Sequence, residues 1–200
     1  FRTNFMQERG RPKAVLRLLP KSIPSPQDLR IPTKVIETAL TSPDGIVIFS
    51  GPTGSGKSTS LAALIQARAN KRDEHVITLE DPIEYDFIAR LPQQFTRREI
   101  GSDTRSFKVG LRSALRQRPH VIMIGEIRDS KTASIALEAA LKGHVIFATM
   151  HTGRVGLSLE TFLSSLPGED YPKALKILPR LLRTVVCQRL VPSIPCGSVA

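Results

Sequence analysis

One octapeptide constrains the fold of this chain more than any other segment, and it reads Gly51-Pro52-Thr53-Gly54-Ser55-Gly56-Lys57-Ser58. Its spacing, G-x-x-x-x-G-K-[ST], is that of a phosphate-binding loop, which requires a strand before it and a helix after it. Residues 46–50 form a largely apolar run, as expected for a parallel strand buried on both faces. A helical pattern follows over residues 57–69. We therefore predict an α/β fold with a nucleotide site where this strand ends.

The residue types in the loop match the chemistry of a bound triphosphate. Glycines let the backbone N–H groups approach phosphate oxygens closely, and the first helical turn adds unpaired N–H donors. Lys57 is expected to reach the β and γ phosphates, and the Ser58 hydroxyl to ligate Mg²⁺. We predict that ATP and Mg²⁺ bind here. The predicted nucleotide-binding residues are Gly51, Thr53, Gly54, Ser55, Gly56, Lys57, Ser58 and Thr59.

Strands and helices alternate along the rest of the chain. The further predicted strands cover residues 76–80, 121–125 and 144–150, with an antiparallel excursion near 88–95. The further predicted helices cover residues 34–41, 106–116, 131–141, 155–166 and 171–182. Strands separated by helices predict a three-layer α/β sheet.

Hydrolysis requires carboxylates beside the phosphates, and two predicted strand ends supply them. The run over 121–124 ends in Gly125-Glu126, so we expect Glu126 to act on Mg²⁺ through water, with Arg128 as a basic candidate beside it. The run over 76–80 leads to Glu84 through Pro82, which sets a rigid turn aimed at the phosphates. One acid after a strand is more often a helix cap or a solvated charge. Two such acids beside a phosphate loop favour catalysis.

Two histidines, His144 and His151, flank the last predicted strand. A separation of seven residues places them on opposite faces of a strand, which argues against a zinc site built from this pair. A lone histidine is more often structural than catalytic. His151 nevertheless lies with Thr149 at a third strand end, where a γ-phosphate could be sensed.

Taken together, these segments resemble the type II/type IV secretion ATPase superfamily, which includes the type IV pilus retraction motors. The matching segments, in order, are 51–58 (Walker A), 77–84 (Asp box), 98–104 and 111–116, 125–129 (Walker B), 143–152 (His box) and the following strand at 188–192. The resemblance implies a RecA-like core, Glu84 as the catalytic glutamate and Glu126 as the Walker B acid. It also implies that His144 and His151 link the state of the γ-phosphate to subunit movement.

The same resemblance carries expectations about assembly and cellular role. It implies a hexameric ring of identical subunits that uses ATP hydrolysis for secretion, conjugal transfer or pilus retraction. It also implies a cytoplasmic position at the inner face of the bacterial inner membrane, against platform proteins of that membrane. Pilus-assembly and type II secretion members carry paired CxxC zinc motifs after residues 188–192, where this chain has only Cys196. That difference favours the retraction-type motors and their Dot/Icm-like and conjugal relatives.

Four domain segments are expected. Residues 1–19 predict a strand or hairpin that needs a partner sheet, and by the resemblance they are the last strands of an N-terminal domain. Four prolines within residues 20–32 predict an extended linker. Residues 33–192 are the predicted ATPase core, and residues 193–200 the start of a further C-terminal region.

The net charge of +11 leaves a DNA-directed RecA-like translocase as the alternative function. The basic residues are dispersed and do not interleave with aromatic residues, so we do not expect nucleic acid as a direct ligand. A non-catalytic scaffold is disfavoured because Lys57, Ser58 and both strand-end glutamates are intact. Two cysteines are too few for a disulfide framework or a tetrahedral metal site. No apolar run approaches the roughly 20 residues that cross a bilayer.

Overall fold

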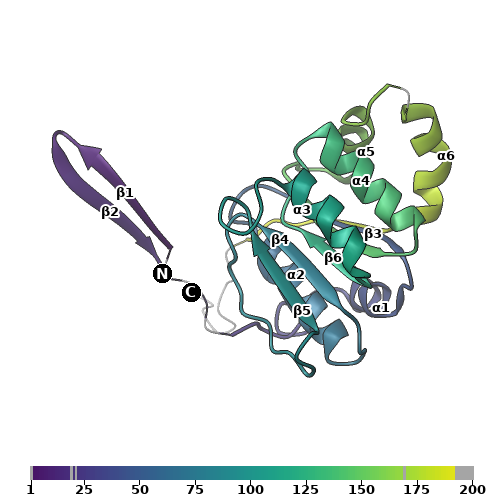
Figure 1. The fold of residues 1–200 in the computed structure, drawn as a ribbon, viewed down its shortest axis with the longest axis horizontal. Coiled ribbons are helices and arrows are strands. Elements are labelled where there is room, and N and C mark those ends of the chain that lie inside the picture. The colour runs from purple at the N-terminus through teal and green to yellow at the C-terminus, as the bar shows by residue number, and fades with distance from the viewer. Residues whose placement is uncertain (1, 19, 21, 169, 192–200) are drawn as a thin grey trace, which may run out of the picture.

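The structure is a computed structural model that describes residues 2–18, 20, 22–168 and 170–191. It consists of an N-terminal hairpin and a layered α/β unit (Figure 1). The strands are β1 (Arg2–Glu8), β2 (Arg11–Arg17), β3 (Gly45–Ser50), β4 (Val76–Glu80), β5 (Phe95–Glu99), β6 (Val121–Ile124), β7 (Val145–Met150) and β8 (Leu182–Cys187). The helices are α1 (Thr33–Thr41), α2 (Lys57–Ala69), α3 (Phe107–Ala114) with a 3-10 turn (Leu115–Gln117), α4 (Ser130–Leu141), α5 (Val155–Ser164) and α6 (Tyr171–Leu181).

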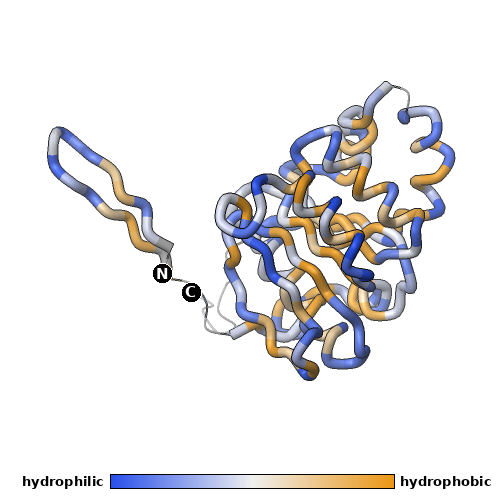
Figure 2. Tube along the Cα trace, viewed as in Figure 1, coloured by the Kyte–Doolittle hydropathy of each residue, from blue (hydrophilic) through white to orange (hydrophobic). Residues whose placement is uncertain are grey.

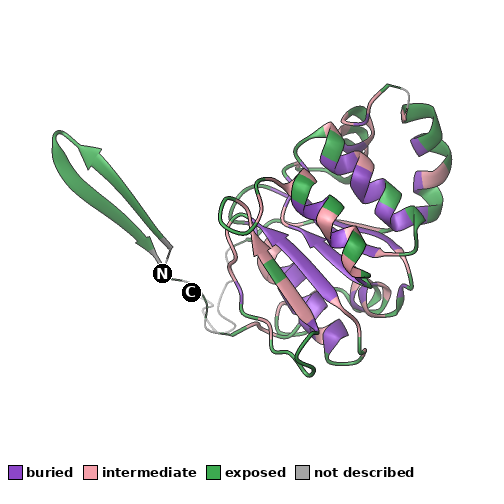
Figure 3. Ribbon diagram, in the orientation of Figure 1, coloured by how far each residue is buried: buried purple, intermediate pink, exposed green. Residues whose placement is uncertain are grey.

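The α/β unit is built on a six-stranded sheet with the strand order β5-β4-β6-β7-β3-β8. All five of its strand pairings are parallel. The four central strands are buried along their whole length, because helices cover both faces of the sheet (Figure 3). The predicted three-layer arrangement is therefore confirmed.

The alternation of side chains along β3 divides the core into two layers. Ile46 and Ile48 pack into a cluster with α3, α4 and α6, whereas Val47 and Phe49 pack into a second cluster with α1 and α2. This is the period of two expected for a strand. Because both faces of the strand are covered, its residues are almost all apolar, and the central strands stand out as apolar segments in Figure 2.

Two predicted elements differ from the structure at the edges of the sheet. The prediction of an antiparallel excursion near 88–95 is wrong. Residues 81–94 form a loop, and β5 then pairs parallel to β4. Side chains satisfy N–H groups of this loop, since Gln66 Oε1 accepts from Ile88 N and Gln94 Oε1 from Arg90 N. The strand expected at 188–192 lies instead at Leu182–Cys187, directly after α6, and residue 192 lies outside the described residues. No turn residue separates α6 from β8, so the sequence pattern did not mark the boundary.

The N-terminal hairpin matches the expectation for residues 1–19, as far as these are described. It projects away from the α/β unit (Figure 1). Phe5 and Leu16 lie on one of its faces, and 80% and 61% of their surfaces are exposed. A lone two-stranded hairpin is marginally stable in water. Its role as the end of a further domain stays a prediction. In the described part of the chain, none of the helices has the length and apolar character that crossing a bilayer requires.

Arg68 of α2 forms a buried ion pair with Glu74 and hydrogen-bonds the end of α1. The Arg68 guanidinium donates to both carboxylate oxygens of Glu74, at 2.6 and 2.7 Å, and to the carbonyl oxygens of Ala39 and Ser42, both at 2.8 Å. Burial alone would raise the pKa of Glu74, but the hydrogen bonds and charges of Arg68 and Arg72 outweigh it and lower this pKa. Arg68 thus links α2 both to Glu74, which follows that helix, and to the carbonyl oxygens of Ala39 and Ser42 at the end of α1.

Replacing Arg68 by Met is expected to lower the free energy of unfolding by about 3–5 kcal/mol at pH 7, because Glu74 is left without its partner. The difference should shrink as the pH falls below 4.5, the ordinary pKa of this carboxyl, since protonation removes the charge that Arg68 stabilises. Urea denaturation at pH 7 and pH 4 measures both effects. Arg72→Met, at a side chain that is 39% exposed, is the control and should cost less than about 1 kcal/mol.

Candidate nucleotide site at the carboxyl edge of the sheet

The phosphate loop joins β3 to α2, as predicted. Gly54 and Gly56 adopt left-handed φ angles of 79° and 85°, which favour glycine. Lys57 Nζ donates to the carbonyl oxygens of Gly51, at 2.8 Å, and Pro52, at 2.9 Å. The loop therefore folds around the lysine side chain and leads directly into the first turn of α2.

The segment after β8 packs against this loop, a contact that the sequence did not indicate. Gln188 N donates to Ser50 O at 2.7 Å, and Ser60 Oγ donates to Gln188 Oε1 at 2.9 Å. A Cβ atom on Gly51 would lie 2.2 Å from Gln188 O, and one on Gly56 would lie 2.9 Å from Gln188 Nε2. Close packing therefore requires glycine at Gly51, where the backbone of Gln188 is in the way, whereas at Gly56 the left-handed φ favours it.

A cavity of about 450 Å³ opens beside the loop. Its walls come mainly from the phosphate loop with the start of α2 and from the ends of β4, β6 and β7 with the loops that follow them. The residues that line it are Thr53, Gly54, Gly56, Lys57, Ser58, Thr59, Glu80, Asp81, Pro82, Glu84, Phe107, Met123, Gly125, Glu126, Arg128, Thr149, His151 and Leu190. The structure thus brings together most of the predicted site residues. Gly51 and Ser55 support the loop from behind this wall.

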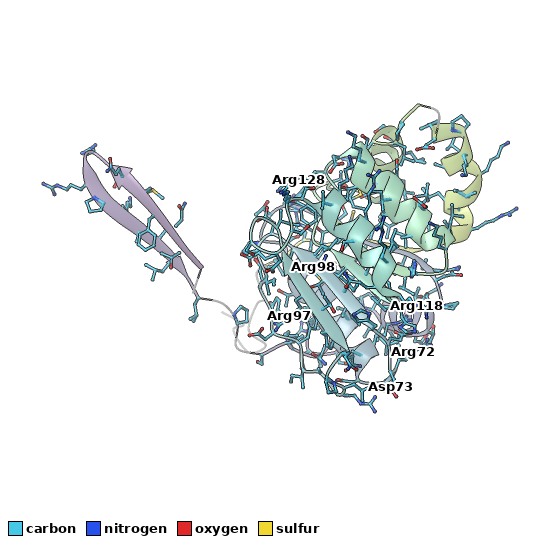
Figure 4. All side chains as sticks on the ribbon, viewed as in Figure 1. Arg72, Asp73, Arg97, Arg98, Arg118 and Arg128 are labelled. Atoms are coloured by element: carbon cyan, nitrogen blue, oxygen red, sulfur yellow. The ribbon has the colours of Figure 1, made fainter. Side chains whose placement is uncertain are left out.

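Glu126 is the most constrained acid of the cavity. Its side chain is 10% exposed, and Oε2 forms an ion pair with Arg128 Nε at 2.5 Å and a hydrogen bond with His151 Nε2 at 3.1 Å. Thr149 Oγ1 donates to Gly125 O, which joins the ends of β6 and β7. Figure 4 shows Arg128 at the end of the sheet opposite to Arg72 and Arg118. Glu126 therefore joins Arg128, through an ion pair, and His151, through a hydrogen bond, into one group beside the loop.

Burial lowers the pKa of Lys57, and the nearby charge of Glu126 opposes this effect. A partly desolvated ammonium group gains most from additional negative charge, which phosphate oxygens supply. The buried Ser55 hydroxyl has no hydrogen-bond partner among the described residues, but Ser55 does not line the cavity. The lowered pKa of Lys57 fits an anion held by this loop.

Glu84 lines the cavity from the turn after β4, and Glu80 lies at the end of that strand. Glu80 is 5% exposed, and burial raises the pKa of its carboxyl above the ordinary value. The sequence placed Glu80 at the end of the predicted strand over 76–80 and in the Asp box, but we assigned it no role from the sequence. Its position as the last residue of a fully buried strand was the signal that could have identified a buried acid.

The structure separates the two histidines that the resemblance links. His151 lies in the cavity wall, whereas His144 lies at the amino end of β7, where its Nδ1 is hydrogen-bonded to Pro119 O at 2.7 Å. His144 is not part of the cavity lining. A role for His144 in coupling the γ-phosphate to subunit movement stays a prediction. His144 lies at the end of β7 that is opposite to His151 and the cavity.

A metal ion would have to share its ligands with the nucleotide. Among the described residues, no group of three His, Cys, Asp or Glu side chains could hold a metal on its own. The Ser58 hydroxyl and the Glu126 carboxylate both line the cavity. In nucleotide sites, Mg²⁺ is usually bound by one or two protein side chains together with phosphate oxygens and water molecules. The residues present therefore fit this ion.

A parallel sheet with a phosphate loop after an inner strand, and acids at the ends of neighbouring strands, defines a P-loop nucleotide-binding protein with a RecA-like core. The chain belongs to the type II/IV secretion system protein family, whose model matches residues 1–198.

Among its relatives, the type IV pilus ATPase PilU of Pseudomonas aeruginosa is 40% identical over 193 residues, which are 96% of this chain and 50% of PilU. A crystal structure of the pilus retraction motor PilT with bound ADP superposes with a TM-score of 0.89 at 38% identity, over 97% of this chain and 56% of that one. The ATPase DotB of Legionella pneumophila superposes with a TM-score of 0.85 at 33% identity, over 96% and 54%. The chain thus spans about half the length of these relatives.

Gly51→Ala is expected to lower the free energy of unfolding by about 3 kcal/mol or more, because the new Cβ meets the backbone of Gln188. Gly54→Ala is the matched control in the same loop. It has open space around the added carbon, so only the left-handed φ opposes it, at about 1–2 kcal/mol. Chemical denaturation of both variants measures the difference, and equal losses would refute the close packing of Gln188 on the loop.

Proposed function

We propose that this chain is the ATP-hydrolysing part of a secretion or pilus motor that assembles as a hexameric ring of identical subunits. One observation carries the proposal: Lys57, Glu84 and Glu126, from three different loops, line the same cavity beside the phosphate loop. Cation, base and metal-directed acid are the groups that phosphoryl transfer to water requires. The names of the relatives, pilus ATPases and a retraction motor, support the same activity.

The residues divide the chemistry as follows. The backbone N–H groups of the loop hold the phosphates of ATP, and Lys57 exchanges its two loop carbonyls for phosphate oxygens. Ser58 and, through a water molecule, Glu126 would hold Mg²⁺, which would supply positive charge to neutralise the triphosphate. Glu84 accepts a proton from the attacking water as the bond between the γ-phosphorus and the bridging oxygen breaks. ADP and inorganic phosphate leave.

Strand β7 is the proposed path from chemistry to movement. His151 hydrogen-bonds Glu126 at one end of the strand, and His144 bonds the Pro119 carbonyl at the other. The strand between them is buried throughout, so it moves as a stiff unit. Loss of the γ-phosphate beside His151 is thereby transmitted to the amino edge of the sheet.

The partners of the ring are proposed to be platform proteins of a bacterial inner membrane, on the cytoplasmic side. Support comes from membership of the secretion family and from the pilus names of the relatives. A DNA-directed motor has less support, since the basic residues are dispersed. Stimulation of ATP hydrolysis by DNA, with a steep dependence on salt, would favour it instead.

Lys57→Ala is expected to abolish ATP binding or hydrolysis, because the ammonium group that faces the phosphates is lost. Measurements of ATP affinity and of phosphate release by the assembled protein test this expectation. ATP turnover at the parental rate in this variant would overturn the placement of the triphosphate.

Glu84→Gln is expected to bind ATP normally and to hydrolyse it about 10²–10⁴ times more slowly, because the amide cannot accept the proton from water. Single-turnover kinetics with bound nucleotide separates the chemical step from binding. Equal turnover in the variant and the parent would refute the assignment of Glu84 as the base.

A further inference from the structure

The turn that carries Glu84 is anchored on its upstream side by the edge strand. Ile83 N donates to Glu99 Oε2 at 3.0 Å. Glu99 is itself held firmly, since it is the register partner of Glu80 and its backbone N–H donates to Asp103 Oδ2 at 2.8 Å. A charged acceptor strengthens a backbone hydrogen bond of this kind. The residue before Glu84 is therefore tied to β5.

The downstream side of the turn is anchored on the nucleotide-binding helix. The Tyr85 hydroxyl is hydrogen-bonded to Thr59 Oγ1 at 2.7 Å, and only 6% of the Tyr85 surface is exposed. Thr59 belongs to the first turn of α2 and lines the cavity next to Ser58. The residue after Glu84 is therefore tied to the helix that receives the phosphates.

We propose that Glu99 and Tyr85 are positioning residues for ATP hydrolysis, which together fix the Glu84 carboxylate relative to the γ-phosphate. The proposal rests on the proposed role of Glu84. It adds two residues that neither belong to the phosphate loop nor line the cavity, and each acts through a neighbour of Glu84 in the chain. Rates of this kind depend steeply on geometry, so a displacement of about 1 Å can cost about 10²-fold.

The two anchors also differ in what they hold. Glu99 fixes the position of the turn relative to the edge of the sheet, because it lies beside Glu80 on the neighbouring strand and accepts from Ile83 N in the turn. Tyr85 couples the turn to α2, so the base and the phosphate-binding helix move as one unit when nucleotide enters. Losing either anchor therefore lowers the rate of the chemical step and leaves the binding of nucleotide largely unchanged.

The test uses Glu99→Leu and Tyr85→Phe in the assembled protein, with Glu99→Gln and Tyr171→Phe as controls. Glu99→Gln keeps an oxygen that can accept from Ile83 N, and Tyr171 is the other of the two tyrosines and is 40% exposed. We expect kcat to fall about 10–100-fold in Glu99→Leu and about 3–10-fold in Tyr85→Phe, with the affinity for a non-hydrolysable ATP analogue changed less than about threefold. Both controls should stay within about twofold of the parent.

A double variant separates positioning from loss of structure. Glu84→Gln combined with Glu99→Leu should be no slower than Glu84→Gln alone, since a residue that acts only through Glu84 has nothing left to position. Parental kcat in both Glu99→Leu and Tyr85→Phe, or equal losses of rate and nucleotide affinity, would overturn the proposal. If Glu99→Leu does not fold, as judged by its melting temperature, Tyr85→Phe and its control decide the question. Full turnover in Glu84→Gln alone would instead refute the proposed function.

Discussion

The parallel pairing of β3, β4, β6 and β7 is the constraint on which the rest of the structure depends. Parallel strands end at one edge of a sheet, so loops that are far apart in the sequence meet there. The phosphate loop, the turn with Glu84, and the loops with Glu126 and His151 become neighbours for this reason. The parallel sheet alone is enough to bring the residues of the site together.

The sequence predicted this arrangement well where the signal was local. The phosphate loop lay between a buried strand and a helix, and its residue pattern indicated a nucleotide as the ligand. Glu84 and Glu126 were recognised because each follows an apolar run, and the structure places both in one cavity. Burial on both faces made the inner strands readable as apolar segments.

The remaining features depend on contacts between distant residues, which no local pattern encodes. Strand β8 follows α6 without a turn signal, and its continuation at Gln188 explains why Gly51 cannot carry a side chain. The segment near 88–95 was predicted to be a strand, but in the structure side-chain acceptors such as Gln66 take the place of strand pairing there. The anchors of the Glu84 turn, Glu99 and Tyr85, come from separate elements and were not foreseen.

The central claim is that a triphosphate and its magnesium ion lie across the loop that ends in Ser58, facing acids from the neighbouring strands. Equilibrium titration of the assembled protein with a non-hydrolysable ATP analogue, in excess Mg²⁺ and again in chelator, tests it most directly. We expect saturable binding with one nucleotide per chain, about tenfold or more weaker once Mg²⁺ is removed. Failure to bind the analogue in excess Mg²⁺, or an affinity that ignores the ion, would contradict it.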